Sequence, residues 1–397
     1  MKKLIVLLAL MAAGLNSFGA GIENVFNAPG YRGESGFEVE NKVLEMTRMA
    51  VPGSTIRAAL YGVNRVIVMK ELIAASKRGV DVRLVLDGGN MENVNTPGHA
   101  INILVNELQC NTGTGCVHFC EGPLEGPLKL VGIKKENYTL GGSCRGLAIN
   151  HNKLFLFSQL SDGSSSVIAQ TSANMNQGQL KMYQDMMILK GDQELFTEFS
   201  KYWARLVLDK TVLFKKSYPT VHAKNLPVSV YFFPRFTGSD PVLELLKRVN
   251  CKLPGSGIRA SQAAFTRSKV AKEMKRLKDE GCSLQVIARV DPKQFSPSAS
   301  VKKSLGDSLL VLPYEGKLPE EQSENSIHTK IVMINASIDN SATKIPVVLT
   351  GSHNLDLFSL RTNDEVLIEV RDQETYNRYN QFLDQILFDA RSAGIKI

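Results

Sequence analysis

The hydrophobic positions of the chain form the same pattern in two places: an apolar run, an amphipathic helical stretch that ends at a glycine, and a second apolar run. In the first copy, the apolar runs cover residues 56–61 and 82–86, and the helical stretch ends at Gly79. In the second copy, the helical stretch ends at Gly281, and the run after it covers residues 284–288. A strand, a helix and a strand in this order predict parallel neighbours joined by a right-handed crossover. The pattern therefore predicts an α/β fold with mostly parallel central sheets flanked by helices.

The two copies also share residues, which indicates an internal duplication. All matched pairs have the same separation along the chain, and the matches are Ile56-Arg57-Ala58 with Ile258-Arg259-Ala260, Lys70-Glu71 with Lys272-Glu273, and Gly79 with Gly281. Repeats of this kind mark structural units that recur in the fold. We therefore expect two pseudo-symmetric lobes, at residues 21–220 and 221–397.

The first residues have the composition of a secretory signal peptide. Met1-Lys2-Lys3 precedes an apolar run at residues 4–13, and small residues follow it. The run is too short to cross a bilayer, which requires ~20 apolar residues. We expect residues 1–20 to be removed and the remaining chain to be secreted or periplasmic. The formal net charge of +8 favours anionic partners.

The six cysteines are disulfide candidates, because an exported protein enters an oxidising compartment. Cys251 and Cys282 precede two strands that we expect to be parallel neighbours, so a bridge between them is predicted. The sequence leaves open the pairing of the other four cysteines, which are Cys110, Cys116, Cys120 and Cys144. A zinc site formed by the first three of these with His118 is the alternative.

A second set of matches lies in polar residues suited to phosphate chemistry. His151 and Lys153 stand two residues apart in an apolar, β-prone context, and His328 and Lys330 repeat this arrangement. Residues two apart on a strand face the same side, so each histidine points the same way as its lysine. A lysine supplies a positive charge for phosphate, and a histidine can act as nucleophile, acid or base near neutral pH.

Each of these pairs is followed by a serine, an asparagine and an acidic residue. These residues are Ser172, Asn174 and Asp185 in the first half, and Ser352, Asn354 and Glu365 in the second. The acid follows the asparagine by eleven residues in both halves. One such motif is common by chance, whereas the same order twice in a duplicated chain indicates a shared active site.

The paired motifs resemble the signature of the phospholipase D superfamily, which is H-x-K-x4-D followed by G-[GS]-x-N in each half. The resemblance covers nearly all of the chain after the signal peptide, and its most specific stretch is IHTK with LTGSHNLDLFSLRTNDEVLIEV. The chain departs from the signature at Ser158 and Asn335, which replace the aspartate, and at Thr171, which replaces a glycine. Tyrosyl-DNA phosphodiesterases resemble this variant, since they lack the aspartate and belong to an active family.

The resemblance implies one active site between two similar lobes, a phosphohistidine intermediate, and neither a metal nor another cofactor. It implies that His151 is the nucleophile, and that His328 protonates the leaving oxygen and then activates water or an alcohol. The remaining residues are expected to assist: Lys153, Lys330, Asn174 and Asn354 by binding phosphate oxygens, Asp185 and Glu365 by each orienting one histidine, and Ser172 and Ser352 by supporting the site.

The expected function is that of a monomeric phosphodiesterase that hydrolyses the head-group phosphodiester of a phospholipid, in contact with an anionic membrane surface. An exported endonuclease is an alternative, because positive charge suits a nucleic acid equally well. A non-catalytic phosphate-binding module is a second alternative. Residues 88–148 form a longer connection than their counterpart in the second half, and we expect them to shape the mouth of the site.

Overall fold

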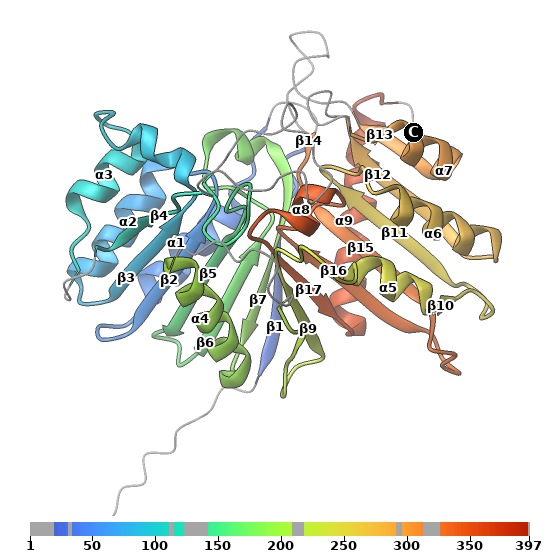
Figure 1. Cartoon of the computed structure of the whole chain (residues 1–397), viewed down its shortest axis with the longest axis horizontal. Helices are drawn as coiled ribbons and strands as arrows, with labels where there is room; N and C mark the ends of the chain where they lie inside the picture. Colours follow the sequence, from blue (N-terminus) through green and yellow to red (C-terminus); the bar gives the residue numbers. More distant parts are fainter. Residues whose placement is uncertain are drawn as a thin grey trace, which may run out of the picture.

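The computed structural model describes residues 20–30, 34–110, 115–122, 142–208, 218–290, 296–312 and 326–395. Apart from Ala20, the predicted signal peptide lies outside this part of the chain. The described residues form two α/β lobes that lie side by side, one from each half of the sequence (Figure 1). The expected two-lobed α/β fold is confirmed.

The first lobe contains a mixed sheet. Its strands, in sheet order, are β1 (Gly21–Asn27), β7 (Met182–Lys190), β6 (Ser165–Thr171), β5 (Lys153–Gln159), β2 (Thr55–Leu60), β3 (Asp81–Leu86) and β4 (Val117–Phe119). A short strand from the second half of the chain, β14 (Ser326–Ile327), pairs in parallel with β7. This pairing carries the residues before His328 into the first lobe.

The second lobe contains a similar sheet. Its strands, in sheet order, are β13 (Leu309–Leu312), β12 (Ser283–Arg289), β11 (Gly257–Gln262), β15 (Lys330–Ile338), β16 (Ile345–Gly351), β17 (Val366–Val370), β9 (Val228–Phe232) and β8 (Val221–His222). A further short strand, β10 (Val249–Asn250), pairs with β15. β5 and β15 thus hold equivalent central places, each beside the first strand of a strand–helix–strand unit.

The expectation that the sheets are mostly parallel is wrong. Parallel pairing joins β2, β3 and β4 in the first sheet and β11, β12 and β13 in the second. Antiparallel pairing joins the other neighbours. In the first sheet these are β2, β5, β6, β7 and β1, in this order, and in the second they are β11, β15, β16, β17, β9 and β8. The cause is local, because short turns after β5 and β15 produce hairpins, whereas a parallel neighbour requires a long crossover.

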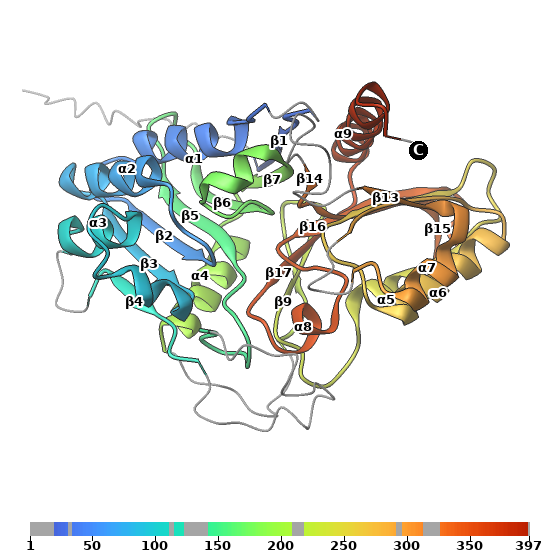
Figure 2. The same cartoon turned by 90° about the horizontal axis from the view of Figure 1, so that it is seen from above.

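Helices pack against both faces of the two sheets. The helices are α1 (Glu38–Met49), α2 (Val66–Lys77), α3 (Ala100–Glu107), α4 (Gln193–Val207), α5 (Pro241–Lys247), α6 (Ser268–Asp279), α7 (Ala299–Leu305), α8 (Leu357–Arg361) and α9 (Gln373–Ser392), with short 3₁₀ helices η1 (Gly88–Asn93), η4 (Gln177–Lys181) and η6 (Gly306–Ser308). α1, α2 and α3 lie along the first sheet, and α5, α6 and α7 lie along the second (Figure 2). One hydrophobic cluster joins each of these groups of helices to its sheet.

The internal repeat is visible where α2 and α6 end. Gly79 and Gly281 follow these helices with φ angles of +93° and +106°, which side chains with a Cβ rarely adopt. The next strand, β3 or β12, begins two residues later in both lobes. The helix ends predicted from the two glycines are confirmed.

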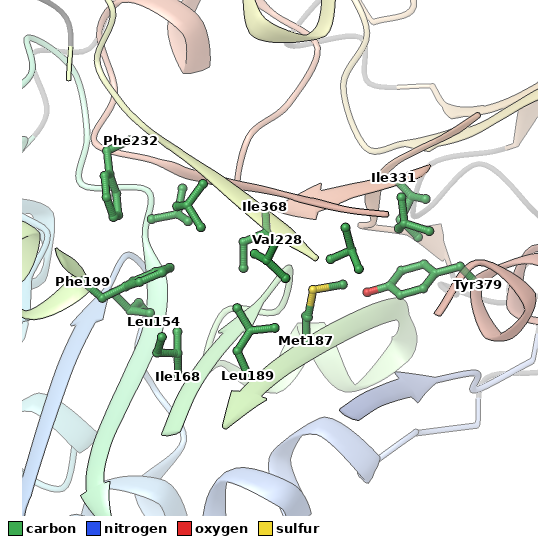
Figure 3. Close-up of a cluster of buried hydrophobic side chains, with 14 of the residues drawn as sticks. Leu154, Ile168, Met187, Leu189, Phe199, Val228, Phe232, Ile331, Ile368 and Tyr379 are labelled. Carbon is green, nitrogen blue, oxygen red and sulfur yellow. The ribbon is translucent and has the colours of Figure 1, made fainter. Parts of the chain in front are cut away.

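A third hydrophobic cluster joins the two lobes to each other (Figure 3). It contains Leu154 and Met187 from the first sheet, Ile331 and Ile368 from the second, and Tyr379 from α9. These side chains are fully buried. Since burial of apolar surface is the main favourable term in folding, this shared cluster fixes the position of one lobe relative to the other.

Three disulfides are present in the described residues. The predicted bridge between Cys251 and Cys282 is confirmed, with Cα atoms 5.1 Å apart. The other two bridges are Cys110–Cys116 and Cys120–Cys144. All three cysteines of the zinc alternative are therefore disulfide-bonded, and that alternative is wrong. Among the described residues, no helix has the length and apolarity needed to cross a membrane.

Candidate active site

The segment that carries each motif histidine is anchored in the opposite lobe. The backbone N–H of His151, just before β5, donates to the carbonyl oxygen of Asp364 at 3.0 Å. The backbone N–H of His328, which follows β14, donates to the carbonyl oxygen of Tyr183 at 3.0 Å. Both histidines therefore lie at the junction of the lobes, as a site shared between two halves requires.

His151 is held by a carboxylate from the second lobe. Its Nδ1 lies 2.9 Å and 3.0 Å from the two side-chain oxygens of Glu365, which is fully buried. Burial and the charges of Lys153 and Lys330 hold the pKa of His151 well below its usual range. A neutral imidazole thus donates its Nδ1 proton to Glu365 and keeps an unprotonated Nε2.

The surroundings of Glu365 shift the pKa of its carboxyl group. Burial raises the pKa of this carboxyl group to about 7, although the charge of Lys153 acts in the opposite direction. The side-chain amide of Asn363 donates to Glu365 Oε1 at 3.1 Å. The ring of Tyr61 meets the ring of His151 edge-on, with centroids 5.2 Å apart. His151 is therefore fixed in orientation by a carboxylate and an aromatic ring.

His328 has a different partner. Its Nδ1 lies 3.0 Å from the carbonyl oxygen of Ser172 and 3.1 Å from Lys330 Nζ. Burial holds the pKa of His328 well below its usual range, and the charges of Lys330, Arg289 and Lys153 act in the same direction. The two imidazoles thus differ in their second-nitrogen partner, since one faces a carboxylate and the other a backbone carbonyl.

The expected contact between Asp185 and a histidine is not formed. Asp185 instead accepts hydrogen bonds from the hydroxyl groups of Thr350 and Tyr379, the latter at 3.0 Å. An aspartate side chain is one methylene shorter than glutamate, and these two hydroxyls hold its carboxylate. Burial raises the pKa of Asp185, and the charge of Lys330 opposes this effect.

The two motif lysines lie close enough to affect each other and both histidines. Lys153 Nζ donates to the carbonyl oxygen of His151 at 2.7 Å, and Lys330 Nζ donates to that of His328. Burial lowers the pKa of Lys153 to about 7. Burial also holds the pKa of Lys330 well below its usual range, and the charge of Lys153 lowers it further. The structure therefore brings the motif histidines and lysines of the two halves into one electrostatic unit.

The motif serines and asparagines occupy equivalent places after β6 and β16. Ser172 and Ser352 accept the backbone N–H of Asp185 and Val366 at 2.9 Å and 3.0 Å, so their hydroxyls hold the neighbouring strand. Each motif asparagine, Asn174 and Asn354, has a buried side-chain oxygen with no hydrogen-bond partner among the described residues. These two oxygens can accept a hydrogen bond from a bound molecule.

Two of the three departures from the family signature have local explanations. Ser158, which replaces the aspartate, accepts the backbone N–H of Thr55 at 2.8 Å, so a hydroxyl supports the start of β2. Thr171, which replaces a glycine, donates to the carbonyl oxygen of Asp185 at 2.7 Å. Gly351 has a φ of +144°, and a Cβ there would lie 2.3 Å from Val366 O, so only the second half requires glycine.

Sequence reasoning missed two charged residues beside the motif lysines. Asp87 and Arg289 follow the matched apolar runs in the two copies of the repeat. Asp87 accepts the backbone N–H of Asn150 at 2.8 Å and of Gly89 at 2.9 Å, and burial raises its pKa to about 6. The signal was their position at the carboxyl ends of parallel strands, where ligands bind in α/β sheets. Their opposite charges concealed the match.

Asp364 is a further residue that the motifs did not reveal. Its carboxylate accepts the Ser143 hydroxyl at 2.8 Å and the backbone N–H groups of Cys144 and Arg145 at 2.7 Å and 3.1 Å. This contact fastens part of the connection at residues 88–148 to the residue before Glu365. The described part of that connection thus lies beside the candidate site.

The comparisons with known proteins agree with this geometry. The family model described as "Cardiolipin synthase, PLD-like domain" matches residues 46–207 and 251–387. The comparison with curated proteins gave no match. Among solved structures, phosphatidylserine synthase from Haemophilus influenzae Rd KW20 is similar, with a TM-score of 0.58 and 13% identity over 92% of this chain and 86% of that one. Polyphosphate kinase from Porphyromonas gingivalis gives a TM-score of 0.50 and 10% identity over 92% of this chain and 50% of that one.

The match to the family model covers one segment in each lobe and includes every motif residue described above. The similarity to these two solved structures, at 13% and 10% identity, shows a shared fold. The chain belongs to the phospholipase D superfamily, in the family of PLD-like domains described for cardiolipin synthase.

Proposed function

We propose that the protein is a metal-independent phosphodiesterase that cleaves the head-group phosphodiester of a phospholipid through a phosphohistidine on His151. The observation that supports this most directly is the contact between His151 Nδ1 and the Glu365 carboxylate. A carboxylate at Nδ1 fixes the tautomer and stabilises the positive charge that the ring acquires when Nε2 attacks phosphorus. His328, which faces a carbonyl oxygen, lacks this stabilisation and is the better proton donor and acceptor.

In the first step, the lone pair of His151 Nε2 forms a bond to phosphorus as the bond from phosphorus to the leaving oxygen breaks. His328 in its protonated form donates the Nε2 proton to that oxygen, and the head-group alcohol departs. In the second step, water attacks phosphorus and gives a proton to His328, and the bond to His151 breaks. The products are the alcohol and a phosphate monoester, and both histidines return to their initial states.

Binding of the substrate favours the protonated form of His328, which the first step requires. In the free protein, Lys330, Arg289 and Lys153 keep the pKa of His328 low. A phosphodiester anion placed among these cations offsets their charge, so the pKa of His328 rises on binding. Protonation of the general acid is therefore coupled to the presence of substrate.

Charge on the transferring phosphoryl group is stabilised by groups already in position. The ammonium groups of Lys153 and Lys330 and the amides of Asn174 and Asn354 offer donors to the non-bridging oxygens. Preorganised donors of this kind require no rearrangement as charge develops. The low solvent exposure of the two histidines, 6% for His151 and 9% for His328, strengthens these interactions.

The phospholipid substrate is supported by the family description, which names cardiolipin synthase. Export, with the disulfides formed outside the cytoplasm, is part of the same proposal, because three disulfides suit an oxidising compartment. The alternative is a nucleic-acid phosphodiester at the same site, for which the positive net charge is the supporting observation.

A paired assay tests the proposal. The protein without residues 1–20 is incubated in chelator with phospholipid vesicles in one tube and plasmid DNA in another, and His151→Ala serves as the matched control. Head-group release that the variant loses supports the proposal. DNA nicking that the variant loses favours the nuclease alternative, and binding of vesicles without turnover in either tube favours a phosphate-binding module.

A further inference from the structure

The two halves of the candidate site differ in one residue that borders the motifs. Tyr61 follows β2 in the first lobe, and its backbone N–H donates to the carbonyl oxygen of Asn152 at 3.0 Å. Ala263 follows β11 in the second lobe, and its backbone N–H donates to the carbonyl oxygen of Thr329 at 2.8 Å. Asn152 and Thr329 stand between the histidine and the lysine of each motif. The same structural position therefore holds an aromatic ring in one half and a methyl group in the other.

The ring of Tyr61 contacts both members of the first motif. Lys153 Nζ lies over this ring, 5.2 Å from its centroid, which is within the range of a cation–π interaction. The imidazole of His151 lies 5.2 Å from the same ring between centroids, at an interplanar angle of 65°. A methyl group such as that of Ala263 offers neither contact. At this position, only the half that carries His151 presents an aromatic ring to its motif.

The ring supports the Lys153 ammonium group without using its hydrogen-bond donors. The lysine is fully buried, and among the described residues its Nζ donates one hydrogen bond, to the carbonyl oxygen of His151 at 2.7 Å. An ammonium group has three N–H donors, so two of them remain for a bound molecule. A ring face stabilises a desolvated cation through its π electrons. Tyr61 thus stabilises the charge while the remaining donors stay free for a phosphate.

The charge on Lys153 is sensitive to a contact of this size. Burial, which is the largest effect, lowers the pKa of Lys153 to about 7, and the carboxylates of Glu365 and Asp87 act in the opposite direction. The charge of Lys153 in turn acts on the remaining motif residues that titrate, which are His151, His328 and Lys330. Because the ammonium titrates near pH 7, a modest change in its stabilisation changes the charged fraction at neutral pH.

We propose that Tyr61 is a positioning residue of the His151 half, whose ring holds the Lys153 ammonium beside the nucleophile so that both meet the same phosphate. The inference rests on the proposed function, in which His151 attacks phosphorus and Lys153 binds a non-bridging oxygen. The ring fixes the ammonium relative to the imidazole, because both lie against it. With Ala263 at the equivalent position, His328 has no such support, in keeping with its separate role as acid and base.

Two substitutions separate the ring from the hydroxyl group. Tyr61→Phe keeps the ring and its contacts, whereas Tyr61→Leu removes the ring and keeps an apolar side chain. Tyr231→Leu is the matched control, because it removes a ring of β9 in the second lobe that also lies against a cation, with Arg235 Cζ 5.5 Å from the centroid. The measured quantity is kcat/KM as a function of pH, with phospholipid vesicles or plasmid DNA, whichever the native protein cleaves. Thermal unfolding checks that each variant is folded, and Tyr61→Met replaces Tyr61→Leu if the latter is not.

We expect Tyr61→Leu to lower kcat/KM at pH 7 by about tenfold, which lies within the range for a partly desolvated cation–π contact. The basic limb of the pH profile should move to lower pH, because loss of the ring favours the neutral amine of Lys153. Tyr61→Phe should recover most of the rate and the position of the limb, and Tyr231→Leu should leave both close to the native values.

Two results overturn the inference while turnover by the native protein keeps the proposed function intact. One is a basic limb that Tyr61→Leu leaves in place. The other is an equal loss in Tyr61→Phe and Tyr61→Leu, which would assign the effect to the hydroxyl group instead of the ring.

A binding measurement separates failure of the inference from failure of the proposed function. If the native protein cleaves neither phospholipid nor DNA, the proposed function fails, and titration with inorganic phosphate at pH 7 tests the ring without turnover. Phosphate binding that is about tenfold weaker in Tyr61→Leu than in the native protein and Tyr61→Phe still supports the role of the ring. Equal binding by the three proteins, or no binding by the native protein, overturns it.

Discussion

The contact between Glu365 and His151 makes a quantitative prediction for the substitution Glu365→Gln. The glutamine side chain keeps the shape of the residue and an oxygen that accepts the Nδ1 proton of His151, so the ring stays oriented. What is lost is the negative charge 2.9 Å from the imidazole nitrogen. The substitution therefore isolates the electrostatic part of the contact.

The size of the effect follows from the charges involved. Attack by Nε2 on phosphorus makes the His151 ring cationic, and in the native protein this charge faces the Glu365 carboxylate. Two opposite charges about 4 Å apart interact with about 4 kcal/mol at an effective dielectric constant near 20. Each 1.4 kcal/mol in the barrier changes the rate about tenfold, so kcat should fall by about a hundredfold to a thousandfold.

The pH profile gives an independent readout. Burial raises the pKa of Glu365 to about 7, so the carboxylate is charged above this pH and neutral below it. Burial lowers the pKa of Lys153 to about 7, so its ammonium is charged below this pH and neutral above it. The kcat/KM of the native protein should therefore rise and then fall around pH 7, because this parameter reports the free enzyme. Glu365→Gln should abolish the rise on the acidic side and retain the fall on the basic side.

Asp185→Asn is the matched control, because Asp185 occupies the equivalent position and hydrogen-bonds Thr350 and Tyr379 rather than a histidine. We expect this variant to lose less than about tenfold in kcat and to keep the acidic limb. Equal losses in the two variants, or an acidic limb that survives in Glu365→Gln, would refute the assignment of Glu365 to the charge on His151.

Three further predictions concern stability. Replacing both Cys251 and Cys282 by alanine should lower the free energy of unfolding by about 3–4 kcal/mol, because their separation of 31 residues sets the entropy that the unfolded chain regains. Denaturant titration measures this change, and an unchanged midpoint would contradict the prediction. Asp364→Ala should cost about 3 kcal/mol in the same measurement, since three donors from residues 143–145 lose their acceptor; a loss below about 0.5 kcal/mol would contradict the contact. Ser158→Ala should cost about 1 kcal/mol, because the N–H of Thr55 loses its partner, and Ser158→Asn is expected to recover part of it.

The sequence was sufficient for the parts of the fold that depend on local signals. The glycines after α2 and α6, the strands on either side of them, and the Cys251–Cys282 bridge all follow from spacing and residue type. The direction of most sheet pairings did not follow, because antiparallel pairings, among them the hairpins after β5 and β15, outnumber the parallel ones. The short connection at residues 160–164 between β5 and β6 carried the signal, since a connection of that length joins antiparallel neighbours.

For the candidate site, the duplicated motifs predicted the residues but not their partners. Asp185 and Glu365 look equivalent along the chain, yet the length of the side chain and the hydroxyls of Thr350 and Tyr379 separate their contacts. The exchange of segments between lobes, which sets His328 beside Ser172, depends on β14 joining the first sheet. Pairing of this kind depends on tertiary packing, which the sequence motifs do not encode. Asp87 and Arg289 are not detected as a matched pair between the two halves, because their charges differ.

The most direct test of the central claim is the identification of the phosphorylated residue. In His328→Asn, attack on a substrate with a good leaving group should still proceed, while hydrolysis of the intermediate slows for lack of a base. Mass spectrometry of the rapidly quenched variant should then find a phosphoryl adduct on His151 that is absent when His151→Ala is added and much weaker when Glu365→Gln is added. An adduct on another residue, or continued turnover by His151→Ala, would contradict the account.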